Sequence, residues 1–219
     1  MQIETGLIDW TDDRSGDVQT TSLTFADTAV KFGLTDRLHF EFDLTPYTQS
    51  VAHAAGVRDR ASGIGDSGVA VKYRFTRDSA PVQAALYPFV KLPTANHHLG
   101  NGKVEGGVAL LVDSSFGGSA SWDIAPEVDL VADSIGSGYH VAIVQVASAG
   151  LGLSQRLSVS GDVWGQWDFD PAGTVRQYSL DGAAAYLVSN RMQLDAGVNL
   201  GLNRNTAGVE LYSGIAVRF

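Results

Sequence analysis

The chain has 219 residues, no cysteine, 25 glycines, 6 prolines and a formal net charge of −9. That length fits one large all-β domain or two small domains, and the missing cysteines exclude both a disulfide framework and a thiolate metal site. The acidic balance argues against a nucleic-acid partner, which needs a basic surface. No apolar run approaches the ~20 residues of a membrane-spanning helix.

The first residues, Met-Gln-Ile-Glu-Thr-Gly, lack the basic and apolar regions of a signal peptide. If the protein is exported, we expect this sequence to be its mature form, and a cytosolic chain that never had a signal is the alternative.

Short segments that alternate apolar and polar residues fill the sequence, and helical periodicity is nearly absent. Turn residues separate these segments. We predict twelve strands in chain order, at residues 2–11, 20–32, 38–48, 65–76, 82–92, 104–112, 121–132, 139–153, 157–169, 175–188, 192–203 and 209–219.

The last segment shows the pattern most clearly. Val209, Leu211 and Ile215 share one face, Glu210 lies on the other, and the chain ends in Phe219. Period-two alternation that runs to a terminal aromatic is typical of the last strand of a transmembrane barrel, apolar toward lipid and polar toward the lumen. In 139–153 both faces are weakly polar, so we expect a bulge or a register shift there.

The connections between predicted strands alternate in length. Tight connections fall near 33–37, 77–80, 154–156 and 189–191, and longer polar ones near 12–18, 49–63, 93–103, 133–138, 170–173 and 204–208. This arrangement predicts an all-β fold, a closed antiparallel up-and-down transmembrane β-barrel of about twelve strands. Residues 1–219 would form one domain with short periplasmic turns and longer extracellular loops.

The polar faces carry many ionisable residues, whereas the inner face of a soluble sandwich or a lipocalin-like barrel would be apolar. We interpret them as the lining of a hydrated, ion-paired lumen. A more specific hypothesis is that they form a series of binding positions for a solute. The candidates are His39, Glu41, Asp43, Asp66, Lys72, Arg74, Lys91, Asp123, Glu127, Asp129, Asp162, Asp195, Glu210 and Arg218.

The histidines are the first place to look for catalytic or metal chemistry. His97 and His98 are adjacent, so on a strand they would point to opposite faces, and a solvated loop is the simpler interpretation. His39, Glu41 and Asp43 share a face and could form an acid–base cluster, although a structural ion-pair network is the preferred interpretation. The sequence predicts no catalytic residue, cofactor or metal site.

Seven short stretches carry a family resemblance, and they follow one another along most of the chain: residues 32–38, 63–66, 71–75, 90–94, 193–197, 201–203 and 214–219. In sequence and in order they resemble the outer-membrane family of phenol-degradation meta-pathway (MetA-like) transporters. The resemblance implies a Gram-negative outer-membrane barrel, exported with a cleaved signal, recognised by the barrel-assembly machinery through a terminal strand ending at Phe219, and surrounded by lipid and lipopolysaccharide. It also implies uptake of small molecules, with aromatic ones among them.

Two functions follow from these patterns. The first is a passive outer-membrane channel or transporter for small, aromatic or hydrophobic molecules, in which the inward acids favour cations or neutral solutes over anions. The alternative is a non-conducting barrel, plugged by side chains such as Tyr87, Phe89, Trp164 and Arg218, whose loops 49–63 and 93–103 bind a partner. A soluble β protein is a third hypothesis.

Overall fold

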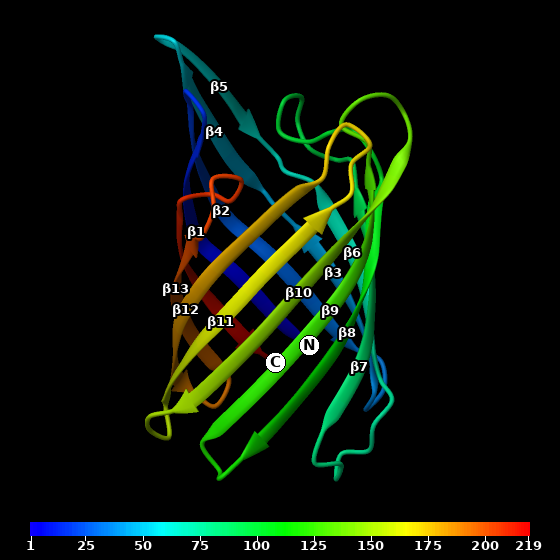
Figure 1. Ribbon diagram of the computed structural model, residues 1–219. Coiled ribbons are helices and arrows are strands. Elements are labelled where there is room, and N and C mark those ends of the chain that lie inside the picture. The colour runs from blue at the N-terminus through cyan, green and yellow to red at the C-terminus, as the bar shows by residue number, and fades with distance from the viewer.

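A computed structural model describes residues 1–219 as antiparallel strands that wrap into a tilted barrel (Figure 1). The chain contains no helix that is long and apolar enough to cross a membrane. The strands are β1 (Gln2–Ser15), β2 (Val18–Gly33), β3 (Leu38–Leu44), β4 (Tyr47–Ala54), β5 (Val57–Gly63), β6 (Ser67–Arg74), β7 (Gln83–Leu92), β8 (Glu105–Phe116), β9 (Ala120–Ala132), β10 (Tyr139–Gly152), β11 (Leu157–Asp168), β12 (Val175–Ser189), β13 (Met192–Gly201) and β14 (Val209–Arg218).

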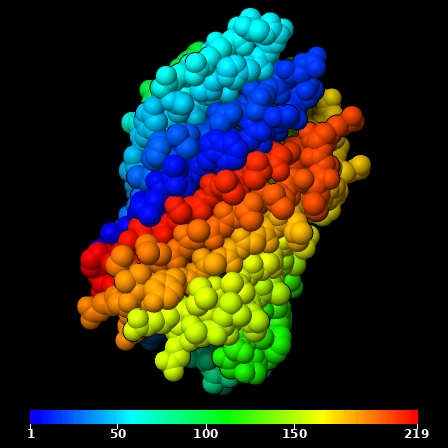
Figure 2. Space-filling model, turned by 90° about the vertical axis from the view of Figure 1, so that its left-hand side faces the viewer, coloured from blue at the N-terminus to red at the C-terminus, as the bar shows by residue number.

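The barrel closes because β1 pairs with β2 on one side and with β14 on the other. Figure 2 shows the first and last strands side by side, in blue and red. At the seam, the backbone N–H of Phe219 donates to the carbonyl oxygen of Met1 at 3.0 Å. Closure leaves no free edge between the first and last strands, as a bilayer requires, and β5 is the one strand that pairs on a single side.

The wall has twelve positions although there are fourteen strands. β4 pairs with the first half of β2 and β3 with its second half, so β3 and β4 together fill one position of the wall. In the same way β5 pairs with β4 and β6 pairs with β3, so β5 and β6 fill the next position. The break between β3 and β4 falls at Thr45-Pro46, where proline has no N–H to donate to the sheet. The predicted closed twelve-strand antiparallel barrel is confirmed.

The prediction of long loops at 12–18 and 49–63 was wrong. β1 and β2 continue to a turn at Gly16-Asp17, and residues 47–63 form the β4–β5 hairpin, which rises above the neighbouring loops in Figure 1. Ala55 (φ 48°) and Gly56 (φ 80°) make its turn. Water meets both faces of these extensions, so no apolar alternation marks them as strands.

The expected register shift in 139–153 was also wrong, because β10 pairs without interruption with both β9 and β11. Its inward positions include Ala142 and Val144, which are buried by their neighbours. Because β10 carries apolar residues on both of its faces, its sequence shows little alternation between apolar and polar residues, although its register with the neighbouring strands is regular. The shifts occur instead between Gly6 and Ile8 in β1 and between Leu187 and Ser189 in β12.

The molecule has no central hydrophobic core. Only 13 of 219 residues are buried, and no large side chain is fully buried. The outward side chains of Val128, Leu130 and Val163 are 50%, 53% and 55% exposed. An apolar outer band around a polar interior matches a hydrocarbon solvent outside and water inside.

Hydroxyl side chains tighten the short-turn end of the barrel. Thr35 Oγ1 accepts the backbone N–H of Leu38 at 3.0 Å, and Ser154 Oγ accepts that of Leu157 at 3.0 Å. Such side-chain caps stabilise turns that the chain must make within a few residues. The same end carries both termini, as an even number of wall positions requires.

Candidate functional site

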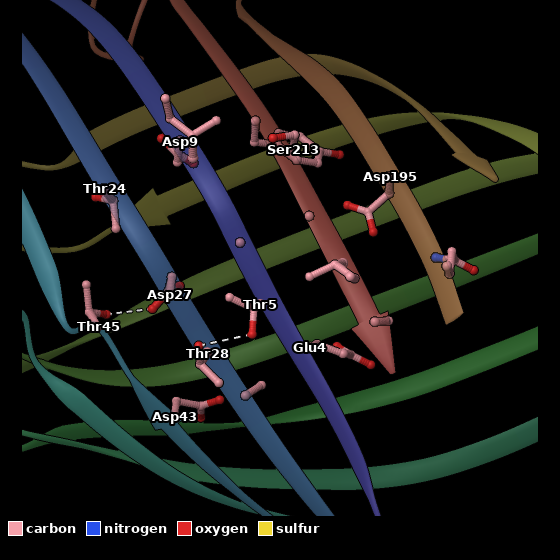
Figure 3. A pocket seen from close by; sticks show the side chains of 18 of the residues that line it. Glu4, Thr5, Asp9, Thr24, Asp27, Thr28, Asp43, Thr45, Asp195 and Ser213 are labelled. Carbon is pink, nitrogen blue, oxygen red and sulfur yellow. Dashed lines mark hydrogen bonds between the residues drawn. The ribbon is translucent and has the colours of Figure 1, made fainter. Parts of the chain in front are cut away.

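The largest cavity lies inside the barrel, against the wall formed by β13, β14, β1, β2 and β3, and has a volume of about 700 Å³. Figure 3 shows acidic side chains that project around it from neighbouring strands. Threonine, serine, glutamine and tyrosine residues and several small or aliphatic residues complete the lining, and no lysine, arginine or histidine takes part. The five carboxylates are Glu4, Asp9, Asp27, Asp43 and Asp195.

Glycines open the wall at this point. Gly6 and Gly214 face each other in the β1–β14 register, so two inward positions carry no side chain. A Cβ at Gly214 would lie 2.7 Å from Asp195 Oδ1. The carboxylate of Asp195 therefore lies over the bare backbone of Gly214 and takes the place of a side chain there.

Charge compensation is incomplete around the cavity. Lys31 Nζ lies 2.7 Å from Glu4 Oε2, and Thr45 Oγ1 donates to Asp27 Oδ1 at 2.6 Å. Asp27, Asp43 and Asp195 take part in no ion pair. Uncompensated charges of one sign between low-dielectric walls focus a negative potential that attracts cations.

The opposite side of the lumen is filled. Tyr87 and Phe89 of β7 lie with their ring centres 6.3 Å apart, and the inward Ala85 and Ala109 are 4% and 2% exposed. A smaller cavity of about 270 Å³ remains there, lined in part by Glu127. The barrel interior is therefore hollow beside β13–β3 and packed beside β6–β9.

Six of the predicted lumen residues line cavities. Asp43 and Asp195 line the largest one, and Asp43, Lys91 and Glu127 line the small cavity beside Tyr87. Glu210 shares a cavity of about 310 Å³ with Trp164. Arg218 lines another of about 270 Å³ near the β12–β13 turn.

Lys91 and Arg74 form ion pairs toward opposite ends of the barrel. At the loop end, Lys91 Nζ lies 3.1 Å from Asp66 Oδ2 and 2.8 Å from Glu105 Oε2. At the turn end, Arg74 pairs with Asp78. These contacts tie loops and turns to the wall.

His39 and Glu41 belong to an ion-pair network rather than to a catalytic arrangement. His39 Nε2 lies 3.9 Å from Glu41 Oε2, which also lies 3.8 Å from Lys31 Nζ. Lys72 sits beside His39 in the β3–β6 register. The network holds a buried carboxylate, since Glu41 is 7% exposed.

Two acidic candidates lie opposite further acids, and a third packs against a glycine. In the strand registers Asp123 faces Asp113, and Asp162 faces Asp181. Asp129 packs against Gly107, where an added Cβ would collide with its carboxylate. The structure thus groups acids around much of the interior.

Glu4, Asp9 and Asp27 were not among the predicted site residues. The extra residue at Leu7 reverses the alternation in β1, and Ala26 adopts φ 56° in β2. Each irregularity moves the following residues to the other face, so a strict period of two assigns Asp9 and Asp27 wrongly. Glu4 precedes the bulge, and no irregularity explains its omission. The adjacent apolar pair Leu7-Ile8 is the one signal in the sequence that could have placed a bulge there.

The closed wall, the apolar exterior and the acidic interior define a transmembrane β-barrel of the bacterial outer-membrane type. The chain belongs to the family described as "Putative MetA-pathway of phenol degradation", which matches residues 1–219. No curated protein sequence matches it.

Solved structures with the same fold cover the whole chain. The COG4313 outer membrane channel from Pseudomonas putida F1 is 12% identical, with a TM-score of 0.78 and 95% of that chain covered. The KdgM porin in complex with disordered oligogalacturonate is 8% identical, with a TM-score of 0.60 and 99% covered. The CymD monoaromatic hydrocarbon channel is 8% identical, with a TM-score of 0.52 and 87% covered. At these identities the likeness establishes the fold.

The terminal Phe219 is 68% exposed and lies outside β14. Its use as a signal by the barrel-assembly machinery stays a prediction.

Proposed function

We propose that the protein is a passive outer-membrane channel for small solutes that prefers cations and neutral molecules to anions. The mature chain would sit with its short turns toward the periplasm, after removal of a signal peptide. The observation that carries the proposal is the cavity of about 700 Å³ lined by five carboxylates and by no basic side chain. Rings of acidic side chains select cations in other channels.

Small aromatic molecules are the proposed neutral solutes. The family description names phenol degradation, and one structural neighbour is titled a monoaromatic hydrocarbon channel. A volume of about 700 Å³ falls within the roughly 300–1,000 Å³ of typical small-molecule sites. Tyr212 offers an aromatic surface at the wall of this cavity.

Planar-bilayer recording of the purified barrel tests the channel. In a KCl gradient we expect stepwise conductance. Because the cavity is acidic, K⁺ should permeate faster than Cl⁻, and the sign of the reversal potential should show this preference. Liposomes containing the barrel should take up phenol-sized solutes faster than liposomes of the same lipid alone. Absence of both conductance and solute flux in protein that is folded would contradict the proposal.

A non-conducting, partner-binding barrel is the alternative, and the filled side of the lumen favours it. Tyr87, Phe89 and the buried alanines occupy the interior beside β6–β9, and the β4–β5 hairpin projects beyond the wall. If this alternative holds, shortening loop 93–103 or the hairpin should abolish binding of a partner, and the bilayer should show no conductance in any variant.

We further propose that the outer face of the β4–β5 hairpin binds lipopolysaccharide phosphates. In the register of β4 and β5, Arg58 lies opposite His53 and Arg60 lies opposite Val51. Followed across β2 and β1, these positions belong to the outward face of the wall, which also carries Trp10. Both arginines are exposed. Basic side chains near an anionic membrane surface contribute about 1 kcal/mol each.

The Arg58→Ser/Arg60→Ser variant should therefore bind lipopolysaccharide micelles roughly thirty-fold more weakly, since two such contacts are lost. Affinity is measured by fluorescence anisotropy of labelled lipopolysaccharide. Arg37→Ser/Arg77→Ser, at the turn end, is the control of equal charge. Equal affinity of the two variants would contradict this assignment.

A further inference from the structure

A buried histidine surrounded by aspartates lies at the loop end of the barrel, away from the large cavity. His140 is the second residue of β10, and its side chain is 6% exposed. Asp133 follows β9, Asp168 ends β11, and Asp170 belongs to the β11–β12 loop. Two connecting loops and two strands thus bring four ionisable groups together.

One ring nitrogen of His140 has an evident partner. Nδ1 lies 2.9 Å from Asp133 Oδ1, and a carboxylate can only accept, so Nδ1–H is the donor. This hydrogen bond fixes the ring orientation and leaves Nε2 as the free position. A carboxylate behind a histidine is the usual support of a metal-binding imidazole.

The second nitrogen is buried without a hydrogen bond. Nε2 lies 2.8 Å from Asp168 Oδ1, yet the direction of a proton on this nitrogen would miss the oxygen, so the contact lacks hydrogen-bond geometry. A tetrahedral ion with ligand atoms at ~2.0 Å holds them ~3.3 Å apart, so ion binding would widen this contact by roughly 0.5 Å. The unused nitrogen and its misalignment with the oxygen suit an ion between the two atoms.

Asp170 offers a third ligand. A ring nitrogen of His140 and one oxygen each from Asp168 and Asp170 lie within 4.8 Å of one another, and Asp170 Oδ2 lies 3.9 Å from His140 Nδ1. Backbone N–H groups hold both carboxylates: Asp170 donates to Asp168 Oδ1 at 2.9 Å, and Ser134 donates to Asp170 Oδ2 at 2.8 Å. The backbone N–H of Ala172 also donates to Asp170 Oδ1, at 2.6 Å.

We propose that His140 Nε2, Asp168 and Asp170 bind a divalent first-row metal ion, with Zn²⁺ as the best match. Imidazole nitrogen and carboxylate oxygen are both ligands of this ion, and a water would complete its four-fold coordination. The bound ion would fasten the start of β10 to the end of β11 and to the β11–β12 loop at the rim. The site is independent of the proposed channel function.

Isothermal titration of the folded, chelator-treated barrel with ZnCl₂ in detergent tests the site. We expect one Zn²⁺ per chain, and at least a ten-fold loss of affinity in Asp168→Asn, which keeps the side-chain shape. The control is His97→Ala/His98→Ala. These two rings lie outside the proposed site, and their centres are 3.9 Å apart, so they could bind a metal ion together. This control should bind Zn²⁺ as the unchanged protein does.

No binding to the unchanged barrel, or equal binding by Asp168→Asn, would overturn the proposal, and so would loss of binding in the His97→Ala/His98→Ala control. A second measurement needs no variant of the site. Cu²⁺ added to the unchanged barrel should give an electron paramagnetic resonance spectrum with coupling to one imidazole nitrogen. Coupling to two nitrogens, or to none, would contradict a site built on His140 alone.

Discussion

The Glu4→Gln/Asp43→Asn/Asp195→Asn barrel is expected to lose most of its preference for K⁺ over Cl⁻. These three carboxylates line the 700 Å³ cavity together. A unit charge ~10 Å from an ion in water contributes about 0.4 kcal/mol, so three contribute roughly 1 kcal/mol. That energy corresponds to about a five-fold change in the permeability ratio, which reversal potentials in a KCl gradient measure.

Salt and a matched variant separate this effect from a change of net charge. Asp17→Asn/Asp36→Asn/Asp59→Asn removes the same number of charges from exposed positions outside the cavity, and its selectivity should stay unchanged. The difference between the two variants should shrink from 0.1 M to 1 M salt, because the screening length falls from ~10 Å to ~3 Å. Equal selectivity of both variants at 0.1 M would show that the cavity does not govern permeation.

The sequence predicts the barrel because the solvent on each side of the wall dictates the residue types. Where lipid meets one face and water the other, as for Val128 beside Asp129, alternation is strict and the strand is evident. The β4–β5 hairpin breaks this rule, because it stands in water and only the backbone pairing and the turn at Ala55-Gly56 define it.

The candidate site is harder to predict, because a cavity depends on which inward residues come together across strands. The alternation predicts that Asp43 and Asp195 point inward, but only strand closure places β13 within reach of β3 through β14, β1 and β2. Asp9 and Asp27 follow irregularities that the sequence marks weakly. The cluster at His140 joins two loops, so no local pattern reveals it.

Replacement of Gly106 by alanine should lower the stability of the barrel by about 2 kcal/mol or more, as expected when a side chain is forced into backbone. A Cβ at this position would lie 2.5 Å from the Phe89 carbonyl oxygen and 3.2 Å from Val90 Cα. Both are backbone atoms of β7, so no side-chain rotation can relieve the contact. β7 and β8 would have to separate beside the Lys91–Glu105 ion pair.

Urea unfolding in detergent, monitored by tryptophan fluorescence, measures the loss of stability as a lower urea concentration at the unfolding midpoint. Gly161→Ala is the matched control: it lies within β11, and the nearest atom to an added Cβ is the Asp181 carbonyl oxygen at 3.9 Å. That control should unfold at the midpoint of the unchanged barrel, because the methyl group meets only ordinary contacts. If Gly106→Ala unfolds at this midpoint too, then β7 and β8 do not approach as closely as the structure places them.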